Sequence, residues 1–271
     1  MLDQTRDDTA VAGGPTETVT LSIDGREVTA PKGTTIWNAA RDAGFEIPVL
    51  CHDPKLEPIG VCRMCAVEVE GARVMAASCV RECEDGMVVK TASEKVDRCR
   101  AMLTELLLSE QRAESGKESA TGDDELAALQ RKYGVEVRLP SGNSRPIDHS
   151  SPAIAVDHQA CILCDKCIRA CDDIQNNDVI GRTGKGYQAR ISFDLDNPMG
   201  VSTCVTCGEC VAACPTGALL NKPLGAPIRP RTELKTVDSV CPYCGVGCGL
   251  TYHVDEERNR VVFAEGRENP G

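Results

Sequence analysis

Apolar and polar residues alternate near the start of the chain. Residues 19–30 alternate around Asp24 and Gly25, and an Asp-Gly pair between alternating runs is the strongest short-range signal of a β-hairpin. Residues 33–44 then change to a helical pattern that begins at a threonine and stops at a glycine. The pattern predicts a hairpin followed by a helix, after a polar leader at residues 1–17 that we expect to be disordered.

The rest of the pattern predicts short elements separated by polar segments. The elements expected are two strands in 66–75, an amphipathic helix over 96–109, a solvated linker at 110–124, a short helix over 124–133, a strand pair within 179–196 and a strand-rich segment from Leu234. No stretch approaches the roughly eighteen apolar residues of a membrane-spanning helix. We therefore expect no direct membrane insertion.

Seventeen cysteines change this picture, because fifteen of them fall into four successive groups. Two groups repeat the spacing C-x2-C-x2-C-x3-C, which is typical of [4Fe-4S] clusters. In two-cluster ferredoxins the fourth cysteine of each run ligates the other cluster. The expected ligand sets therefore cross between the runs. They are Cys161, Cys164, Cys167 and Cys214 for one cluster, and Cys204, Cys207, Cys210 and Cys171 for the other.

Two further groups flank the twin runs. The first reads C-x10-C-x2-C-x13-C and consists of Cys51, Cys62, Cys65 and Cys79. The last consists of Cys241, Cys244 and Cys248 and lacks a fourth member. A zinc knuckle is the alternative to an iron-sulfur cluster for the first group.

Several other residues favour a structural interpretation. Cys83 and Cys99 lie outside every group, and we interpret them as buried or incidental thiols. His158 precedes the first run, but eight cysteines already satisfy two clusters, so we expect it to be structural or on the surface. The glycines at 181–186 have neither phosphate-loop nor dinucleotide spacing and predict a turn. We identify no catalytic residue.

Composition limits the class of protein. Only 3% of the 271 residues are aromatic, so bound clusters would have to supply stability that a thin apolar core does not. The net charge of −11 argues against a nucleic-acid partner. The N-terminus lacks the features of a signal peptide, so we expect a reducing, cytoplasmic compartment, where thiols bind metal rather than form disulfides.

Two stretches carry a family resemblance. The hairpin, helix and first cysteine group resemble a β-grasp [2Fe-2S] ferredoxin, as found at the start of the large iron-sulfur subunit of complex I, of NAD-linked hydrogenases and of NAD-linked formate dehydrogenases. The stretch 240–250, which holds the last cysteine group, resembles the opening of molybdopterin oxidoreductases, especially cytoplasmic formate dehydrogenase catalytic subunits. In that family the fourth cysteine lies downstream, so we expect the chain to be a fragment.

One family motif is missing. Complex I subunits and many relatives follow the long helix with H-x3-C-x2-C-x5-C, which binds a further [4Fe-4S] cluster. Here Gln111 stands where the histidine is expected, and no cysteine lies between Cys99 and Cys161. This absence favours a formate dehydrogenase variant over complex I and the hydrogenases.

The resemblance implies an α+β chain of successive domains. They are a leader at 1–17, a β-grasp [2Fe-2S] ferredoxin-like domain at 18–95, linking helices at 96–150, a 2[4Fe-4S] ferredoxin-like domain at 151–230, and the start of a molybdopterin oxidoreductase iron-sulfur domain at 231–271. The implied cofactors are one [2Fe-2S] cluster, two [4Fe-4S] clusters, a third [4Fe-4S] cluster if its ligand set is completed, and a molybdenum or tungsten bis-pterin dinucleotide only in the full-length enzyme.

The function implied is electron transfer between a formate-oxidising pterin centre outside this chain and a flavin/NAD partner. The implied partners are the pterin-containing remainder of the catalytic subunit, a flavin- and NAD-binding β subunit and a small [2Fe-2S] γ subunit. One alternative is a free-standing electron-transfer subunit of a hydrogenase diaphorase or complex I-like assembly. A purely structural zinc protein is the other alternative.

Overall fold

The structure is a computed structural model that describes residues 17–112, 115–140, 144–222 and 229–267. The chain divides into a first unit, Met1–Pro48 with Cys65–Val96, and a second unit, Val49–Met64 with Asp97–Gly271. The predicted leader and most of the proline-rich connector after Lys222 lie outside the described residues. Within the described ranges no helix is long and apolar enough to cross a membrane.

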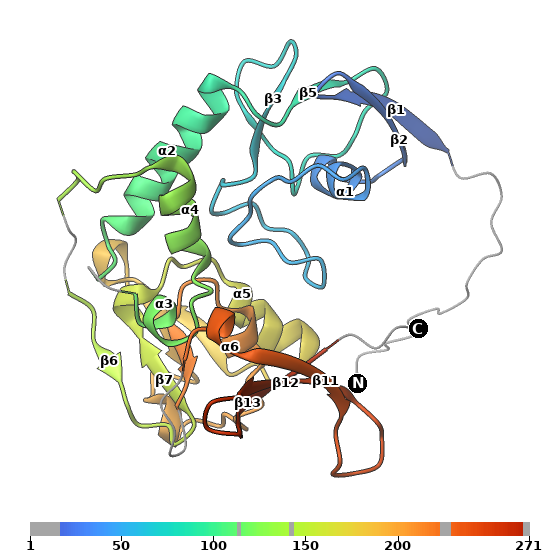
Figure 1. Ribbon diagram of the computed structural model, residues 1–271. Helices are drawn as coiled ribbons and strands as arrows, with labels where there is room; N and C mark the ends of the chain where they lie inside the picture. Colours follow the sequence, from blue (N-terminus) through green and yellow to red (C-terminus); the bar gives the residue numbers. More distant parts are fainter. Residues whose placement is uncertain (1–16, 113–114, 141–143, 223–228, 268–271) are drawn as a thin grey trace, which may run out of the picture. The chain divides into compact units, whose positions relative to one another are not determined.

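The first unit is a small mixed sheet with one helix. Its elements are β1 (Thr18–Ile23), β2 (Arg26–Pro31), α1 (Ile36–Asp42), β3 (Ala66–Val69), β4 (Ala76–Ala77) and β5 (Val88–Lys90). The strand order is β2-β1-β5-β3-β4, and the blue strands β1 and β2 in Figure 1 are the predicted hairpin. Asp24 and Gly25 both have positive φ, as this turn requires. The Thr35 side chain caps α1 by accepting from the Asn38 N–H.

In the second unit, the twin cysteine runs alternate with two strand pairs. The elements are β6 (Ile147–Asp148), β7 (Ile154–Asp157), α5 (Lys166–Arg169), a short π-helix (Ala170–Ile174), β8 (Ile180–Thr183), β9 (Arg190–Phe193), α6 (Glu209–Ala213) and β10 (Leu219–Asn221). β7 precedes the first run and pairs antiparallel with β10, which follows the second run. β8 follows the first run and pairs antiparallel with β9, which precedes the second. Each strand pair therefore brings one end of the first run next to the opposite end of the second run.

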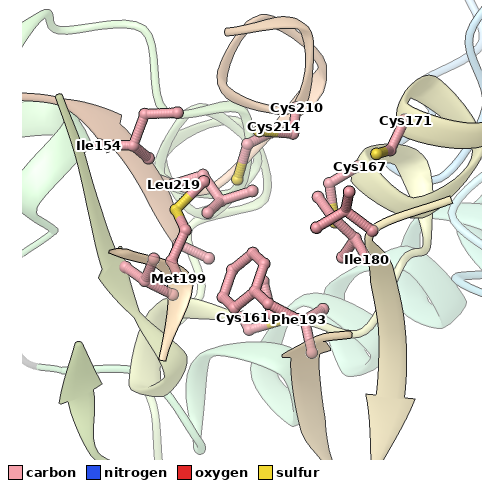
Figure 2. Close-up of a cluster of buried hydrophobic side chains, with 14 of the residues drawn as sticks. Ile154, Cys161, Cys167, Cys171, Ile180, Phe193, Met199, Cys210, Cys214 and Leu219 are labelled. Atoms are coloured by element: carbon pink, nitrogen blue, oxygen red, sulfur yellow. The ribbon is translucent and has the colours of Figure 1, made fainter. Parts of the chain in front are cut away.

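The core of this ferredoxin-like region is built from apolar side chains and cysteines together. Phe193, Ile191 and Leu219 are each about 1% exposed, and six cysteines of the twin runs belong to the same buried cluster or line its edge. Figure 2 shows Phe193, Met199 and Leu219 among the sulfur-bearing side chains. The two loops that carry the cysteines thus share one apolar wall.

Helices α2 (Glu94–Leu108) and α4 (Glu125–Tyr133) match the two helices expected from the pattern. Leu126 and Leu129 of α4 pack with Leu50 and Met64, and apolar residues of α2 cover the same cluster. The expected solvated linker is wrong in part, because it contains a further helix, α3 (Gly116–Ala120). The Ser115 side chain caps α3, and the helix packs against the loop after Cys214.

The last described segment is a three-stranded antiparallel sheet, which matches the strand-rich segment expected from Leu234. It consists of β11 (Lys235–Val240), β12 (Gly249–Asp255) and β13 (Arg260–Gly266). His253 of β12 stacks on Phe263 of β13, with 4.0 Å between the ring centroids. Arg231 ties this sheet to the rest of the second unit, because its guanidinium contacts both Glu265 and Asp123.

Candidate iron-sulfur sites

The twin runs adopt the same backbone path. Leu163 and Asp165 have positive φ, and the equivalent positions of the second run, Thr206 and Gly208, do too. Non-glycine residues rarely adopt this conformation, so its repetition at matching positions is not a chance of local packing. This conformation curls each loop around the first cysteine of its run. The Leu163 N–H donates to Cys161 Sγ at 3.4 Å, and the Thr206 N–H donates to Cys204 Sγ at 3.4 Å. The duplication seen in the spacing is therefore also a duplication in structure.

The first candidate site draws on both runs. One cavity is lined by four cysteines, Cys161, Cys164, Cys167 and Cys214. Cys214 reaches it because the Asp157 N–H donates to Ala218 O at 2.8 Å where β7 meets β10, and the Thr216 hydroxyl donates to Ala160 O at 2.6 Å. All four cysteines are buried. Four convergent thiols around one cavity are a donor set that fits a [4Fe-4S] cluster.

The second candidate site also draws on both runs, with one cysteine from the first run and three from the second. Another cavity is lined by Cys171, Cys204, Cys207 and Cys210, together with apolar residues such as Ile154 and Ile180. Cys171 belongs to the first run and is brought here by the β8–β9 pair, where the Asp194 N–H donates to Val179 O at 2.9 Å. Cys207 is exposed, so this site lies nearer the surface than the first.

Burial opposes ionisation of these thiols. It raises the pKa of Cys161 to about 11 and that of Cys210 to about 12, and it also raises the pKa of Cys164, Cys167 and Cys171. Neighbouring cysteines add to the effect, since a second thiolate nearby disfavours the first. The charged form needed for ligation is therefore favoured only when a cation shares the cavity. No three His, Cys, Asp or Glu side chains in the described ranges form a single-ion site.

Three cations lie next to the first cavity. Lys166, between Cys164 and Cys167, is buried and lies 3.8 Å from both Asp53 and Glu125. Arg145 is also buried, donates to Cys161 O at 3.3 Å and pairs with Glu110. The third, Lys117 of α3, donates from Nζ to Cys214 O at 2.7 Å. Sequence reasoning missed all three, because their partners are distant in the chain.

The cysteines of the first group form two close pairs. In the second unit, the Cys51 N–H donates to Cys62 Sγ at 3.4 Å, and the Cys62 N–H donates to Cys51 Sγ at 3.5 Å. The hydrogen bond from the Cys62 thiol lowers the pKa of Cys51 to about 6 and raises that of Cys62. In the first unit, the sulfurs of Cys65 and Cys79 are 3.3 Å apart and both residues are buried.

The last cysteine group lies on the loop between β11 and β12. Cys244 and Cys248 are exposed, and the Cys241 N–H donates to Cys248 O at 2.8 Å. Gly245 and Gly247 have positive φ, which curves this loop. Three cysteines are therefore carried on one turn.

The other residues named in the sequence analysis do not belong to the four cysteine groups. Cys83 is buried in the first unit, and burial raises its pKa, whereas Cys99 is partly buried on α2. Neither residue lines the two cavities described above. His158 is 6% exposed, and burial lowers its pKa, so it is a core histidine rather than a surface one. Gly184 and Gly186 lie in the turn between β8 and β9, as expected, but Gly181 lies in β8, so the turn is shorter than predicted.

Comparison with known proteins adds three domain assignments. Residues 16–94 match the model of a 2Fe-2S iron-sulfur cluster binding domain. Residues 151–220 match the ferredoxin-like domain of NADH-quinone oxidoreductase subunit 3, and residues 234–270 match the molybdopterin oxidoreductase Fe4S4 domain. Domains for both 2Fe-2S and 4Fe-4S clusters are thus present.

A solved structure decides the family. A chain of an NAD+-reducing [NiFe]-hydrogenase in the H2-reduced state is 30% identical and has a TM-score of 0.70, with 79% of this chain and 92% of that chain covered. The chain belongs to the family of iron-sulfur subunits found in NADH-quinone oxidoreductases and their relatives. The expected fold class, a [2Fe-2S] ferredoxin-like domain followed by ferredoxin-like [4Fe-4S] domains, is confirmed.

Curated relatives are longer than this chain. The α subunit of NADPH-Fe(3+) oxidoreductase from Geobacter sulfurreducens is 36% identical over 93% of this chain and 30% of its own length. NADH-quinone oxidoreductase subunit 3 from Thermus thermophilus is 29% identical over 93% of this chain and 36% of its own length. The chain thus spans 30% and 36% of the lengths of these two relatives.

Proposed function

We propose that this chain is the iron-sulfur, electron-transferring part of a larger NAD(P)-linked oxidoreductase. The observation that carries the proposal is the crossed lining of the two cavities, since each receives three cysteines from one run and one from the other. Clusters bound there would supply one-electron transfer. The names of relatives, which include an NADPH-Fe(3+) oxidoreductase and an NADP-reducing hydrogenase, support a nicotinamide-linked partner subunit.

The proposed ligands follow the four cysteine groups. Each of the two cavities would hold a [4Fe-4S] cluster through its own four cysteines. Cys51, Cys62, Cys65 and Cys79 would hold a [2Fe-2S] cluster, which is supported by their spacing and by the family model that spans them. Cys241, Cys244 and Cys248 would hold part of a third [4Fe-4S] cluster, with its fourth ligand from elsewhere.

The chain's own residues prepare these sites. The left-handed residues of the loops aim backbone N–H groups at the sulfurs, and hydrogen bonds of that kind stabilise thiolates. Phe193 and Leu219 are buried in the same cluster as cysteines of both runs and exclude water from it. The cations Lys117 and Arg145 beside the first cavity offset the negative charge that four thiolates would bring.

For the parent enzyme, we propose a formate dehydrogenase with a molybdenum or tungsten pterin centre. Two observations support this narrower assignment. The last cysteine group lies in a match to the molybdopterin oxidoreductase Fe4S4 domain. The chain also has no cysteine between Cys99 and Cys161, and α3 occupies part of the segment in which many family members carry another cluster motif. The proposed partners are the pterin-containing remainder of the subunit, a flavin- and NAD-binding β subunit and a small [2Fe-2S] γ subunit.

A second candidate is an electron-transfer subunit of an NAD-linked hydrogenase or complex I-like assembly. The observation that favours it is the 92% coverage of the hydrogenase chain. Such a subunit would share the cluster sites but would receive electrons from hydrogen or from NADH.

Activity of the native complex separates the two candidates. The full-length polypeptide would be purified with its associated subunits, and its molybdenum and tungsten content and its formate-, hydrogen- and NADH-dependent electron transfer would be measured. Formate-dependent NAD+ reduction with bound molybdenum or tungsten would support the formate dehydrogenase. Hydrogen-dependent activity, or NADH oxidation without formate activity, would contradict it. The 271-residue chain is the control, and we expect it not to oxidise formate.

A further inference from the structure

Lys117 lies beside the last ligand of the first candidate site. Its Nζ donates to the main-chain carbonyl of Cys214 at 2.7 Å, although the two residues are 97 positions apart. Lys117 comes from α3, a helix that the polar sequence of this segment did not predict. The contact therefore results from tertiary packing and not from the cysteine-run motif itself.

The packing around α3 fixes Lys117 in this position. A Cβ added at Gly217 would lie 2.5 Å from the Lys117 Cβ, and Gly217 has a φ of +76°. The Glu125 N–H, at the start of α4, donates to Pro215 O at 2.9 Å. Both helices thus contact the loop that runs from Cys214 to Gly217, which leaves the lysine little freedom to move away.

Lys117 differs from the other two cations in its charge balance. Lys166 is matched by Asp53 and Glu125, and Arg145 is matched by Glu110. Lys117 forms no ion pair with any carboxylate in the part of the chain that the structure describes. Its charge acts on a carboxylate only at longer range, because it opposes the rise in the pKa of Glu125 that burial causes, and Glu125 itself pairs with Lys166.

We propose that Lys117 is a tuning residue that raises the reduction potential of the cluster bound by Cys161, Cys164, Cys167 and Cys214. This inference rests on the proposed function, because it requires that cluster. Reduction adds one electron, supplied by a low-potential donor, and hence one negative charge at the site. A fixed ammonium bonded to the carbonyl of a ligand stabilises that added charge. Both sites have acidic neighbours, Asp165 at the first cavity and Asp172 and Asp173 directly after Cys171 at the second.

The test is a redox titration monitored by EPR on the reconstituted chain. Lys117→Gln removes the charge but keeps a hydrogen-bond donor, and Lys117→Arg restores the charge. Lys132→Gln removes the same charge from an exposed position at the end of α4 and is the matched control. The two [4Fe-4S] signals are assigned by comparison with a Cys171→Ser variant, in which the second site lacks a ligand.

We expect Lys117→Gln to lower the potential of the first cluster by about 28 mV or more, which is a threefold change in the equilibrium constant for a one-electron step. We expect Lys117→Arg to restore most of it, and the second cluster and the Lys132→Gln control to change much less. Unchanged potentials in a fully loaded Lys117→Gln protein, or equal shifts of both clusters, would overturn the inference alone. A wild-type chain that binds no [4Fe-4S] cluster would overturn the proposed function as well. If Lys117→Gln does not bind its full iron content, the Lys117→Met and Lys117→Arg variants decide the test. An unchanged potential of the first cluster in Lys117→Met with full iron content, or a lowered potential in Lys117→Arg, would overturn the inference.

Discussion

Arg169 connects the loop that carries Cys51 to the helix between two candidate cluster ligands. Its Nη2 donates to Cys51 O at 2.5 Å, and its Nη1 donates to Glu57 O at 2.6 Å. Arg169 is the last residue of α5, two positions after Cys167 and two before Cys171. One side chain therefore joins two cysteine-bearing segments of the second unit that are 118 residues apart.

Loss of this connection should destabilise the second unit. Arg169→Met removes two hydrogen bonds from a charged donor and leaves both carbonyls without that donor, so we expect the free energy of unfolding to fall by about 2 kcal/mol. Arg138→Met is the control, because the Arg138 side chain forms an exposed ion pair with Glu136, and we expect a change of no more than about 0.5 kcal/mol. Urea unfolding measures both values. A loss of unfolding free energy in Arg169→Met that is no larger than the loss in Arg138→Met would show that Arg169 does not stabilise the second unit.

The fit of α3 on the loop after Cys214 can be measured with glycine substitutions. Gly217→Ala introduces a methyl group 2.5 Å from the Lys117 Cβ, whereas Gly186→Ala meets nothing within 4 Å. Both glycines have positive φ, so both variants share the backbone strain. We expect Gly217→Ala to lower the unfolding free energy by about 1–3 kcal/mol more than Gly186→Ala does. Indistinguishable unfolding midpoints would mean that α3 does not pack tightly against this loop.

Local sequence signals predicted the parts of the fold that depend on neighbouring residues. The hairpin follows from the Asp24-Gly25 pair, and α4 matches the short helix expected over 124–133; in the structure Asp124 caps it and Gly134 ends it. The cysteine spacing also predicted which residues line each cavity, because the two strand pairs bring together the ends that the duplication implies. The ligand assignments themselves stay predictions.

Other features depend on contacts that no local pattern encodes. α3 has only five residues and no buried side chain, so its sequence contains no amphipathic signal. It is stabilised by the Ser115 cap and by the packing against Gly217. Arg169 and Lys166 also gave no signal, since their partners at Cys51 and Asp53 lie far earlier in the chain.

Stability of the iron-free chain should depend on pH. Burial raises the pKa of the Cys161 thiol from 9.0 to about 11, so the folded state keeps a proton that the unfolded state has lost. The stability that this proton linkage contributes is therefore present below about pH 9 and is lost as the pH rises toward 11. The loss is about 1.4 kcal/mol for each unit by which a thiol's pKa is raised.

Urea midpoints of the reduced, iron-free chain would be measured from about pH 8 to about pH 11. A Cys161→Ala/Cys210→Ala variant is the control, because it lacks two of the buried thiols and should show a weaker decline. The cluster-loaded chain should lack this decline too, since its ligating sulfurs are already deprotonated. A wild-type midpoint that does not fall over this range would contradict the raised thiol pKa values.

Ligation across the two runs can be tested with single serine substitutions. Cys171→Ser should disturb the cluster at Cys204, Cys207 and Cys210, because Cys171 lines that cavity and not the one formed by its own run. We expect loss of one [4Fe-4S] signal and of up to about four iron atoms, with the other [4Fe-4S] signal kept. Cys99→Ser is the matched control and should keep the full iron content. If the Cys171 variant and a Cys167→Ser variant lose the same signal, the runs bind their clusters separately.

Iron and sulfide analysis with EPR of the anaerobically purified chain tests the central claim most directly. Eight cysteines around two cavities and the four of the first group predict about ten iron atoms per chain. On reduction, signals of one [2Fe-2S] and two [4Fe-4S] clusters should appear. About fourteen iron atoms would mean that the last group has found a fourth ligand. A colourless protein that binds zinc and gives no EPR signal on reduction would contradict the account.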